Sequence, residues 1–157
     1  MERRLFSFLV VDDEREAADS LASVLRLSGH DCVVAYDGKA ALDESKRFHT
    51  DVVVLDINMP GLDGIATAHC FLSAQTAHTP VLIALTGFAS KEMRLEAMRS
   101  GFDALLTKPV NPNRLIDVAR KLVEDRRLST YPSHAQSPVP RAPADRPYRR
   151  DDRHQQA

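Results

Sequence analysis

The chain has 157 residues, of which 43% are hydrophobic and 27% are charged, a composition that is typical of one globular domain and excludes collagen-like, coiled-coil and wholly disordered proteins. The formal net charge of -1 at pH 7 gives no reason to expect nucleic acid or an anionic membrane as a partner. No apolar run approaches the about 18 residues of a membrane span. We therefore expect no direct DNA binding and no membrane association.

Five short apolar runs recur along the first 128 residues, and each run is continuous rather than alternating with polar residues. Continuous runs of this length are typical of strands that are buried on both faces of a parallel sheet. The runs predict five strands, at residues 8–11, 32–35, 52–55, 81–85 and 104–106.

Between these runs the apolar residues recur at helical spacing, which predicts five intervening helices. The first and last are the clearest, and the second and third, at 38–48 and 64–73, are short with narrow apolar faces. Gly29 and Gly101 follow helical segments, while Asn111 and Pro112 provide an N-cap and a first-turn proline for the last helix. Strands alternating with helices predict an α/β fold, a doubly wound parallel sheet with helices on both faces.

Polar residues follow four of the predicted strands: Asp12 and Asp13, Asp56 and Thr86 stand directly after the first, third and fourth, and Lys108 stands soon after the fifth. Because the carboxyl ends of parallel strands line one crevice, we expect these side chains to converge. Carboxylates about 5 Å apart repel by roughly 3 kcal/mol per pair at an effective dielectric constant near 20, so the cluster needs either protonation or a bound cation, and a divalent metal meets this need. An all-oxygen donor set favours Mg²⁺ or Mn²⁺. With this ion and Lys108 the pocket is formally neutral and can accept a phosphoryl group, with Asp56 as the nucleophile.

Each of these residues also has an ordinary structural interpretation. Asp13 with Glu16 imitates a capping box at the start of the first helix. An isolated Asp56 is most simply a turn residue before Pro60. The six histidines show no metal-ligand spacing, and we interpret them as surface or partly buried residues. The recurrence of polar groups after four strands favours the phosphoryl site over these separate interpretations.

Four segments in sequence order resemble response regulator receiver domains over about residues 5–125: Val-Val-Asp-Asp-Glu, Val-Val-Val-Leu-Asp-Ile-Asn-Met-Pro-Gly-Leu-Asp-Gly, Ala-Leu-Thr-Gly and Leu-Leu-Thr-Lys-Pro-Val. The resemblance implies a flavodoxin-like (CheY-like) fold with strand order 2-1-3-4-5. It also implies that Asp56 accepts phosphate from a histidine kinase or a histidine phosphotransfer protein. The output is then a conformational change that an unknown downstream protein reads on the face formed by the fourth helix, fifth strand and fifth helix.

The same resemblance implies roles for the individual residues. Asp13, Asp56 and the backbone carbonyl of Asn58 ligate Mg²⁺, and Asp12 binds the ion through water. Lys108 and Thr86 contact the phosphoryl oxygens, and the peptide bond between Lys108 and its following proline is cis. One position departs from the family pattern, because Leu105 stands where many receivers carry an aromatic residue that moves inward with the threonine.

The composition changes sharply near residue 128. Residues 129–157 hold five of the nine prolines, five arginines and only one large aliphatic residue, Val139. This predicts a receiver domain at 1–128 and a disordered Pro/Arg-rich tail at 129–157. No effector sequence follows residue 128, so we expect a stand-alone receiver, a relay intermediate or a receiver derived from a hybrid kinase.

Two alternatives to a phosphorylated signalling protein remain. Asp56-Ile57-Asn58 imitates the Asp-x-Asp motif of Mg²⁺-dependent phosphohydrolases with an aspartate nucleophile, although the second acid is missing. The second alternative is an adaptor that has the receiver fold and binds partners without being phosphorylated. The isolated cysteines, Cys32 and Cys70, and the lack of a signal-peptide pattern favour a cytoplasmic protein.

Overall fold

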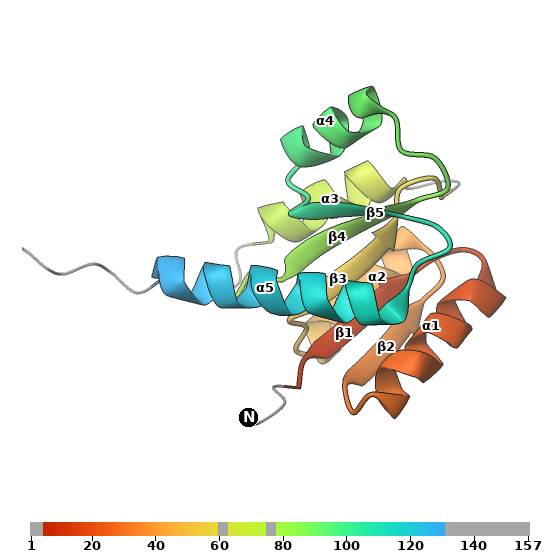
Figure 1. Ribbon diagram of the computed structural model, residues 1–157, viewed down its shortest axis with the longest axis vertical. Helices are drawn as coiled ribbons and strands as arrows, with labels where there is room; N and C mark the ends of the chain where they lie inside the picture. Colours follow the sequence, from red (N-terminus) through yellow and green to blue (C-terminus); the bar gives the residue numbers. More distant parts are fainter. Residues whose placement is uncertain (1–4, 60–62, 75–77, 131–157) are drawn as a thin grey trace, which may run out of the picture.

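The computed structural model describes residues 5–59, 63–74 and 78–130, and within these ranges five strands alternate with five helices (Figure 1). In chain order they are β1 (Ser7–Val11), α1 (Arg15–Leu27), β2 (Asp31–Ala35), α2 (Gly38–Arg47), β3 (Val52–Asp56), α3 (Gly64–Ser73), β4 (Val81–Thr86), α4 (Lys91–Arg99), β5 (Ala104–Thr107) and α5 (Pro112–Thr130).

All strand pairs are parallel, and the sheet order is β2-β1-β3-β4-β5. The expected doubly wound fold and its strand order are therefore confirmed. Each observed strand agrees with its predicted apolar run to within one residue at either end.

The continuous apolar character of the strands follows from two cores, one on each face of the sheet. Val52 and Val54 of β3 face a cluster that includes α1 and α5. Val53 and Leu55, which alternate with them, face a second cluster that includes α2, α3 and α4. Figure 1 shows α1 and α5 together on the near side of the sheet. A strand covered on both faces has no solvent side, so none of its positions needs a polar residue.

Helix ends follow the predicted local signals at several points. Gly29 and Gly101 have φ values of 95° and 97°, a conformation that glycine adopts with least strain after a helix. Asn111 Oδ1 accepts hydrogen bonds from the backbone N–H groups of Asn113 and Arg114, which confirms the cap of α5.

Two interpretations drawn from the sequence do not hold. The apolar residues Met93, Ala97 and Met98 predict the inner face of the fourth helix, but Met98 is 53% exposed while Ala97 is buried. The capping box of Asp13 is also absent from α1, because the N-cap is Glu14 and no side chain caps it. Instead, the backbone N–H of Glu14 donates to Asp12 Oδ1 at 3.0 Å. The first acidic residue, not the second, thus holds the start of this helix.

The last helix continues to Thr130, two residues into the range predicted as a tail. Residues 131–157, where the rest of that prediction falls, lie outside the described residues. Within the described ranges, no helix combines the length and the apolar character that crossing a bilayer requires.

Arg126 ties α5 to the loops at the amino ends of the sheet. Its guanidinium donates to the carbonyls of Thr79 and Pro80 at 2.8 and 2.7 Å. The same group donates to both carboxylate oxygens of Asp103 at 3.0 and 2.9 Å. Besides suiting the C-terminal end of the helix by its charge, Arg126 thus anchors α5 to the segments before β4 and β5.

Replacing Arg126 with alanine should lower the free energy of unfolding by about 1–3 kcal/mol, because several charge-assisted hydrogen bonds are lost together. Urea unfolding followed by circular dichroism measures the change. Arg120→Ala is the matched control on the same helix, since Arg120 makes only an exposed pair with Asp117 and such pairs contribute at most about 1 kcal/mol. Equal effects of the two substitutions would contradict the anchoring role.

Candidate functional site

Three carboxylates meet where β1 and β3 end. Asp12 and Asp13 directly follow β1, and Asp56 is the last residue of β3. One carboxylate oxygen from each lies within 4.8 Å of the other two. Asp12 and Asp56 are 3% and 6% exposed, whereas Asp13 is exposed. The predicted convergence of these three acids is therefore confirmed.

Lys108 brings the single positive charge of the predicted set into this pocket. It follows β5, and its backbone N–H donates to the carbonyl of Thr86 at the end of the neighbouring strand. Its Nζ donates to Asp12 Oδ2 at 2.7 Å and to Asp56 Oδ2 at 3.1 Å. Its peptide bond to Pro109 is cis, as the resemblance implies.

The protonation of Lys108 is secured by these two carboxylates. Burial lowers the pKa of the ammonium group, but the hydrogen bonds and charges of Asp12 and Asp56 outweigh burial and raise the pKa above its usual value. Because the pKa of Lys108 is raised in the folded state, the stability that its contacts with Asp12 and Asp56 contribute is fully present below the ordinary pKa of lysine. It is lost only as the pH rises through the raised pKa of the folded state. The pocket thus keeps its ammonium group at neutral pH.

Asn58 links Asp56 to Thr86. Its backbone N–H donates to Asp56 Oδ1 at 2.9 Å, a local turn that fixes the carboxylate. Its side-chain amide donates to Thr86 Oγ1 at 3.2 Å. Thr86, the last residue of β4, is fully buried. The threonine therefore lies beside the acidic pocket, but it reaches Asp56 only through Asn58.

The hydroxyl of Thr86 also connects the pocket to α4. It donates to the carbonyl of Phe88 at 2.9 Å and lies 3.2 Å from Met93 Sδ. The Phe88 N–H in turn points at the same oxygen, at 3.3 Å. Neither Phe88 nor this role of Met93 was identified from the sequence, because the contacts depend on how the loop after β4 folds back.

Gly64 is a site residue that the sequence analysis missed. It begins α3, and a Cβ there would lie 2.5 Å from Ile57 Cα and 2.6 Å from the Asp56 carbonyl oxygen. The helix thus packs directly on the backbone that carries Asp56, at a distance only glycine permits. The available signal was the Asp63-Gly64 pair, which places an N-cap and a small residue just after the turn.

The donor set fits a magnesium ion. Octahedral Mg²⁺ with ligands at about 2.0–2.1 Å places its ligand oxygens about 3–4 Å apart, and one oxygen from each of the three carboxylates lies within 4.8 Å of the other two. Imidazole and thiolate groups are absent from the described cluster of Asp12, Asp13 and Asp56, which matches the preference of hard cations for oxygen. Asp12 and Asp56 are already largely shielded from water, whereas the exposed Asp13 must lose part of its hydration when it binds the ion.

Fold and pocket together define a CheY-like flavodoxin fold with an acidic, lysine-bearing rim at the carboxyl ends of its strands. The model of the family "response regulator receiver domain" matches residues 8–120. The chain belongs to this family, whose members act in two-component signal transduction.

Named relatives agree with this assignment. The chain is 36% identical over 129 residues to the transcriptional regulatory protein PrrA of Mycobacterium tuberculosis, covering 82% of this chain and 54% of PrrA. It is 34% identical over 139 residues to the response regulator protein FleR of Pseudomonas aeruginosa, covering 88% of this chain and 28% of FleR. The chain thus spans about half of PrrA and less than a third of FleR.

Solved structures give the same result. The receiver domain of the Francisella response regulator 1452 is 35% identical with a TM-score of 0.69, over 77% of this chain and 98% of that one. A CheY-like receiver domain protein from Methanospirillum hungatei has a TM-score of 0.71 at 24% identity, over 80% of this chain and 99% of that one, and supports the fold alone.

Proposed function

We propose that the chain is the phosphoacceptor receiver of a two-component phosphorelay, and that Asp56 carries the phosphoryl group. The single observation that supports this most is the position of Asp56, whose carboxylate lies among two further acids and within 3.1 Å of Lys108 Nζ. A nucleophilic oxygen, a cation for the phosphoryl oxygens and a donor set for Mg²⁺ thus meet at one point.

In the proposed reaction, one Asp56 oxygen attacks the phosphorus of a phosphohistidine, and the bond from phosphorus to the imidazole nitrogen breaks. The electron pair of that bond stays on the imidazole, and Asp56 becomes an acyl phosphate that water later hydrolyses. Asp12, Asp13, Asp56 and the Asn58 carbonyl would hold Mg²⁺, with Asp12 acting through water. A bound Mg²⁺ would offset the carboxylate charges and stabilise the charge on the phosphoryl oxygens.

The proposal is tested by incubating the chain with acetyl phosphate and Mg²⁺ and comparing intact masses with those of Asp56→Asn. The wild type should gain the mass of one phosphoryl group, and the variant should gain none. No gain in either protein would favour an unphosphorylated adaptor. Sustained hydrolysis of a phosphomonoester, abolished by Asp56→Ala, would favour a phosphohydrolase.

Thr86 supplies the proposed link from phosphorylation to output. Its hydroxyl would turn from Phe88 and Met93 toward a phosphoryl oxygen, releasing its contacts with the loop after β4 and with α4. Leu105, buried at the usual aromatic position, is an aliphatic side chain and has no polar tip to move between solvent and interior. We therefore assign the movement in this chain to the β4–α4 loop and α4 rather than to a rotating aromatic residue.

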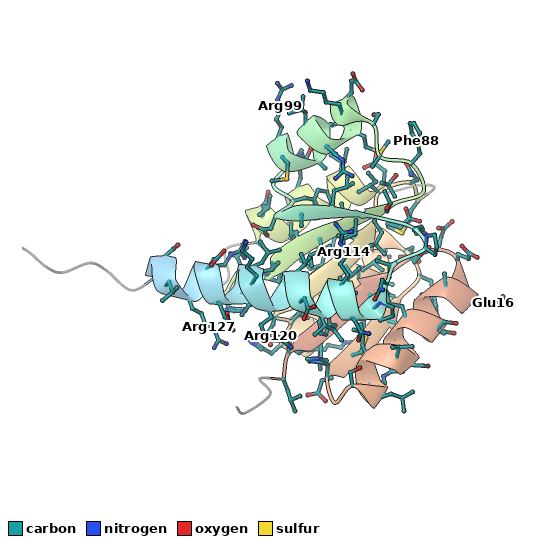
Figure 2. The ribbon with its side chains drawn as sticks, in the orientation of Figure 1. Glu16, Phe88, Arg99, Arg114, Arg120 and Arg127 are labelled. Carbon is teal, nitrogen blue, oxygen red and sulfur yellow. The ribbon has the colours of Figure 1, made fainter. Side chains whose placement is uncertain are left out.

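The surface around α4 fits a protein partner. Phe88, Leu95 and Met98 are 76%, 48% and 53% exposed, and Figure 2 shows Phe88 on the loop before α4 and Arg99 at the end of that helix. Exposed apolar side chains on an element that responds to phosphorylation suit a downstream protein that reads the change. We propose output through this protein contact, on the face of α4, β5 and α5, in the cytoplasm and without direct DNA binding.

Lys108→Ala should reduce the conformational response more than phosphate uptake. All three acids, Asp56 included, remain, so acetyl phosphate should still phosphorylate the variant, but the cation that draws the phosphoryl toward β5 is lost. Intact mass reports uptake, and hydrogen exchange of the backbone in α4 reports the response. A variant that takes up no phosphate at all would contradict this division of roles.

A further inference from the structure

Three side chains gather at the amino ends of β3 and β4: His49, Asp51 and His78. His49 Nε2 lies 3.3 Å and His78 Nε2 lies 3.7 Å from the same oxygen, Asp51 Oδ1. Asp56 stands five positions after Asp51 along an extended strand, which places the two residues about 16 Å apart at 3.3 Å per residue. This cluster is therefore distinct from the acidic pocket at the other end of the sheet.

The spacing of the three ligand atoms matches a tetrahedral metal site. Zinc ligands at about 2.0–2.1 Å from the ion lie about 3.3–3.5 Å from one another at tetrahedral angles. The two separations from Asp51 Oδ1, 3.3 and 3.7 Å, are close to this edge length, and the ligand atoms of the three residues lie within 4.8 Å of one another. The histidine side chains are 68% and 50% exposed, so each imidazole can rotate to complete the geometry.

The carboxylate of this cluster is already oriented. Asp51 Oδ2 accepts hydrogen bonds from the backbone N–H and the hydroxyl of Ser7, at 3.0 and 3.1 Å. The Asp51 backbone donates to the Ser7 carbonyl and accepts from Val81 N–H, both at 2.9 Å. These contacts direct Oδ1 at the two imidazoles, and such outer hydrogen bonds strengthen metal binding.

We propose that His49, Asp51 and His78 bind one Zn²⁺ ion, with water as the fourth ligand. Two imidazoles and one carboxylate select a borderline transition metal over Mg²⁺ or Ca²⁺, which prefer all-oxygen sites. Arg126 lines the same hollow as these residues, and its guanidinium donates to both oxygens of Asp103. The ion would connect the segment before β3 to the segment before β4 and would stabilise the folded state by mass action.

Isothermal titration of the full chain with Zn²⁺, in a buffer with saturating Mg²⁺, tests the proposal. The double variant His49→Gln/His78→Gln should bind one Zn²⁺ fewer than the wild type. Each single variant should bind that ion at least about tenfold more weakly, since even outer-shell substitutions cost about 10–100-fold. Zn²⁺ should also raise the melting temperature of the wild type and not that of the double variant.

His69→Gln is the matched control, because His69 is an exposed histidine on α3 outside the cluster. It should bind Zn²⁺ as the wild type does. Uptake of phosphate from acetyl phosphate, measured on the double variant, shows that it is folded and that the acidic pocket is independent of the cluster. Equal Zn²⁺ stoichiometry and affinity in the wild type and the double variant would overturn the proposal.

Discussion

Asp13→Asn should weaken Mg²⁺ binding by at least about tenfold. Two unit charges 4 Å apart interact by about 4 kcal/mol at an effective dielectric constant of about 20. Losing only a third of this energy, about 1.4 kcal/mol, lowers a binding constant tenfold. Asp13 is the exposed member of the three acids, and its removal leaves Asp12, Asp56 and Lys108 in contact. Phosphate uptake should therefore persist but require much more Mg²⁺.

The measurement is the rate of phosphate uptake from acetyl phosphate across a Mg²⁺ titration, compared with Glu16→Gln. Glu16 is an exposed acid in the first turn of the neighbouring helix α1 (Figure 2), so its substitution removes the same charge close to the pocket. The midpoint of the titration should shift strongly for Asp13→Asn and little for Glu16→Gln. Equal midpoints for the two variants would show that Asp13 is not a ligand.

Gly64→Ala should destabilise the fold by about 1–3 kcal/mol, the usual cost of inserting atoms into a packed site. The added Cβ would lie 2.5 Å from Ile57 Cα, so either α3 or the end of β3 must move. Because that strand end carries Asp56, the substitution should also slow phosphate uptake.

Gly87→Ala is the control for this substitution. A Cβ at Gly87 meets nothing within 4 Å, so its stability should stay the same or rise by up to about 1 kcal/mol through the less flexible unfolded chain. Thermal unfolding of the two variants measures the difference in their stability. A Gly64→Ala protein as stable as Gly87→Ala would mean that the close approach of α3 to Asp56 is not required.

The sheet and the acidic pocket could be predicted from sequence because both depend on one regularity. Each strand is buried on both faces and therefore appears in the sequence as a continuous apolar run. The first polar residue after the run marks the carboxyl end of that strand. In a parallel sheet those ends share one rim, so Asp12 and Asp56 meet although 44 positions separate them. The strand order and the cis peptide before Pro109 came from the resemblance to receiver domains, not from this regularity.

Features that depend on the exact packing of loops and helices were not predictable in the same way. Met98 is apolar and directly follows the buried Ala97, but it stands five residues after Met93, off the narrow stripe on which α4 packs, and it is 53% exposed. His49 and His78 show no short ligand spacing, since strand β3, helix α3 and their connecting segments separate them along the chain. They meet because β3 and β4 begin side by side, and that contact requires knowing where both loops fold.

The contacts of Thr86 have a consequence for how sharply this domain can respond. A threonine hydroxyl carries one proton, and in this structure it lies within donating distance of two acceptors, the Phe88 carbonyl and Met93 Sδ. If Asp56 is phosphorylated as we propose, a phosphoryl oxygen would compete for the same proton. A bond from Thr86 to the phosphoryl group and the resting contacts of the β4–α4 loop would then exclude each other within any one molecule.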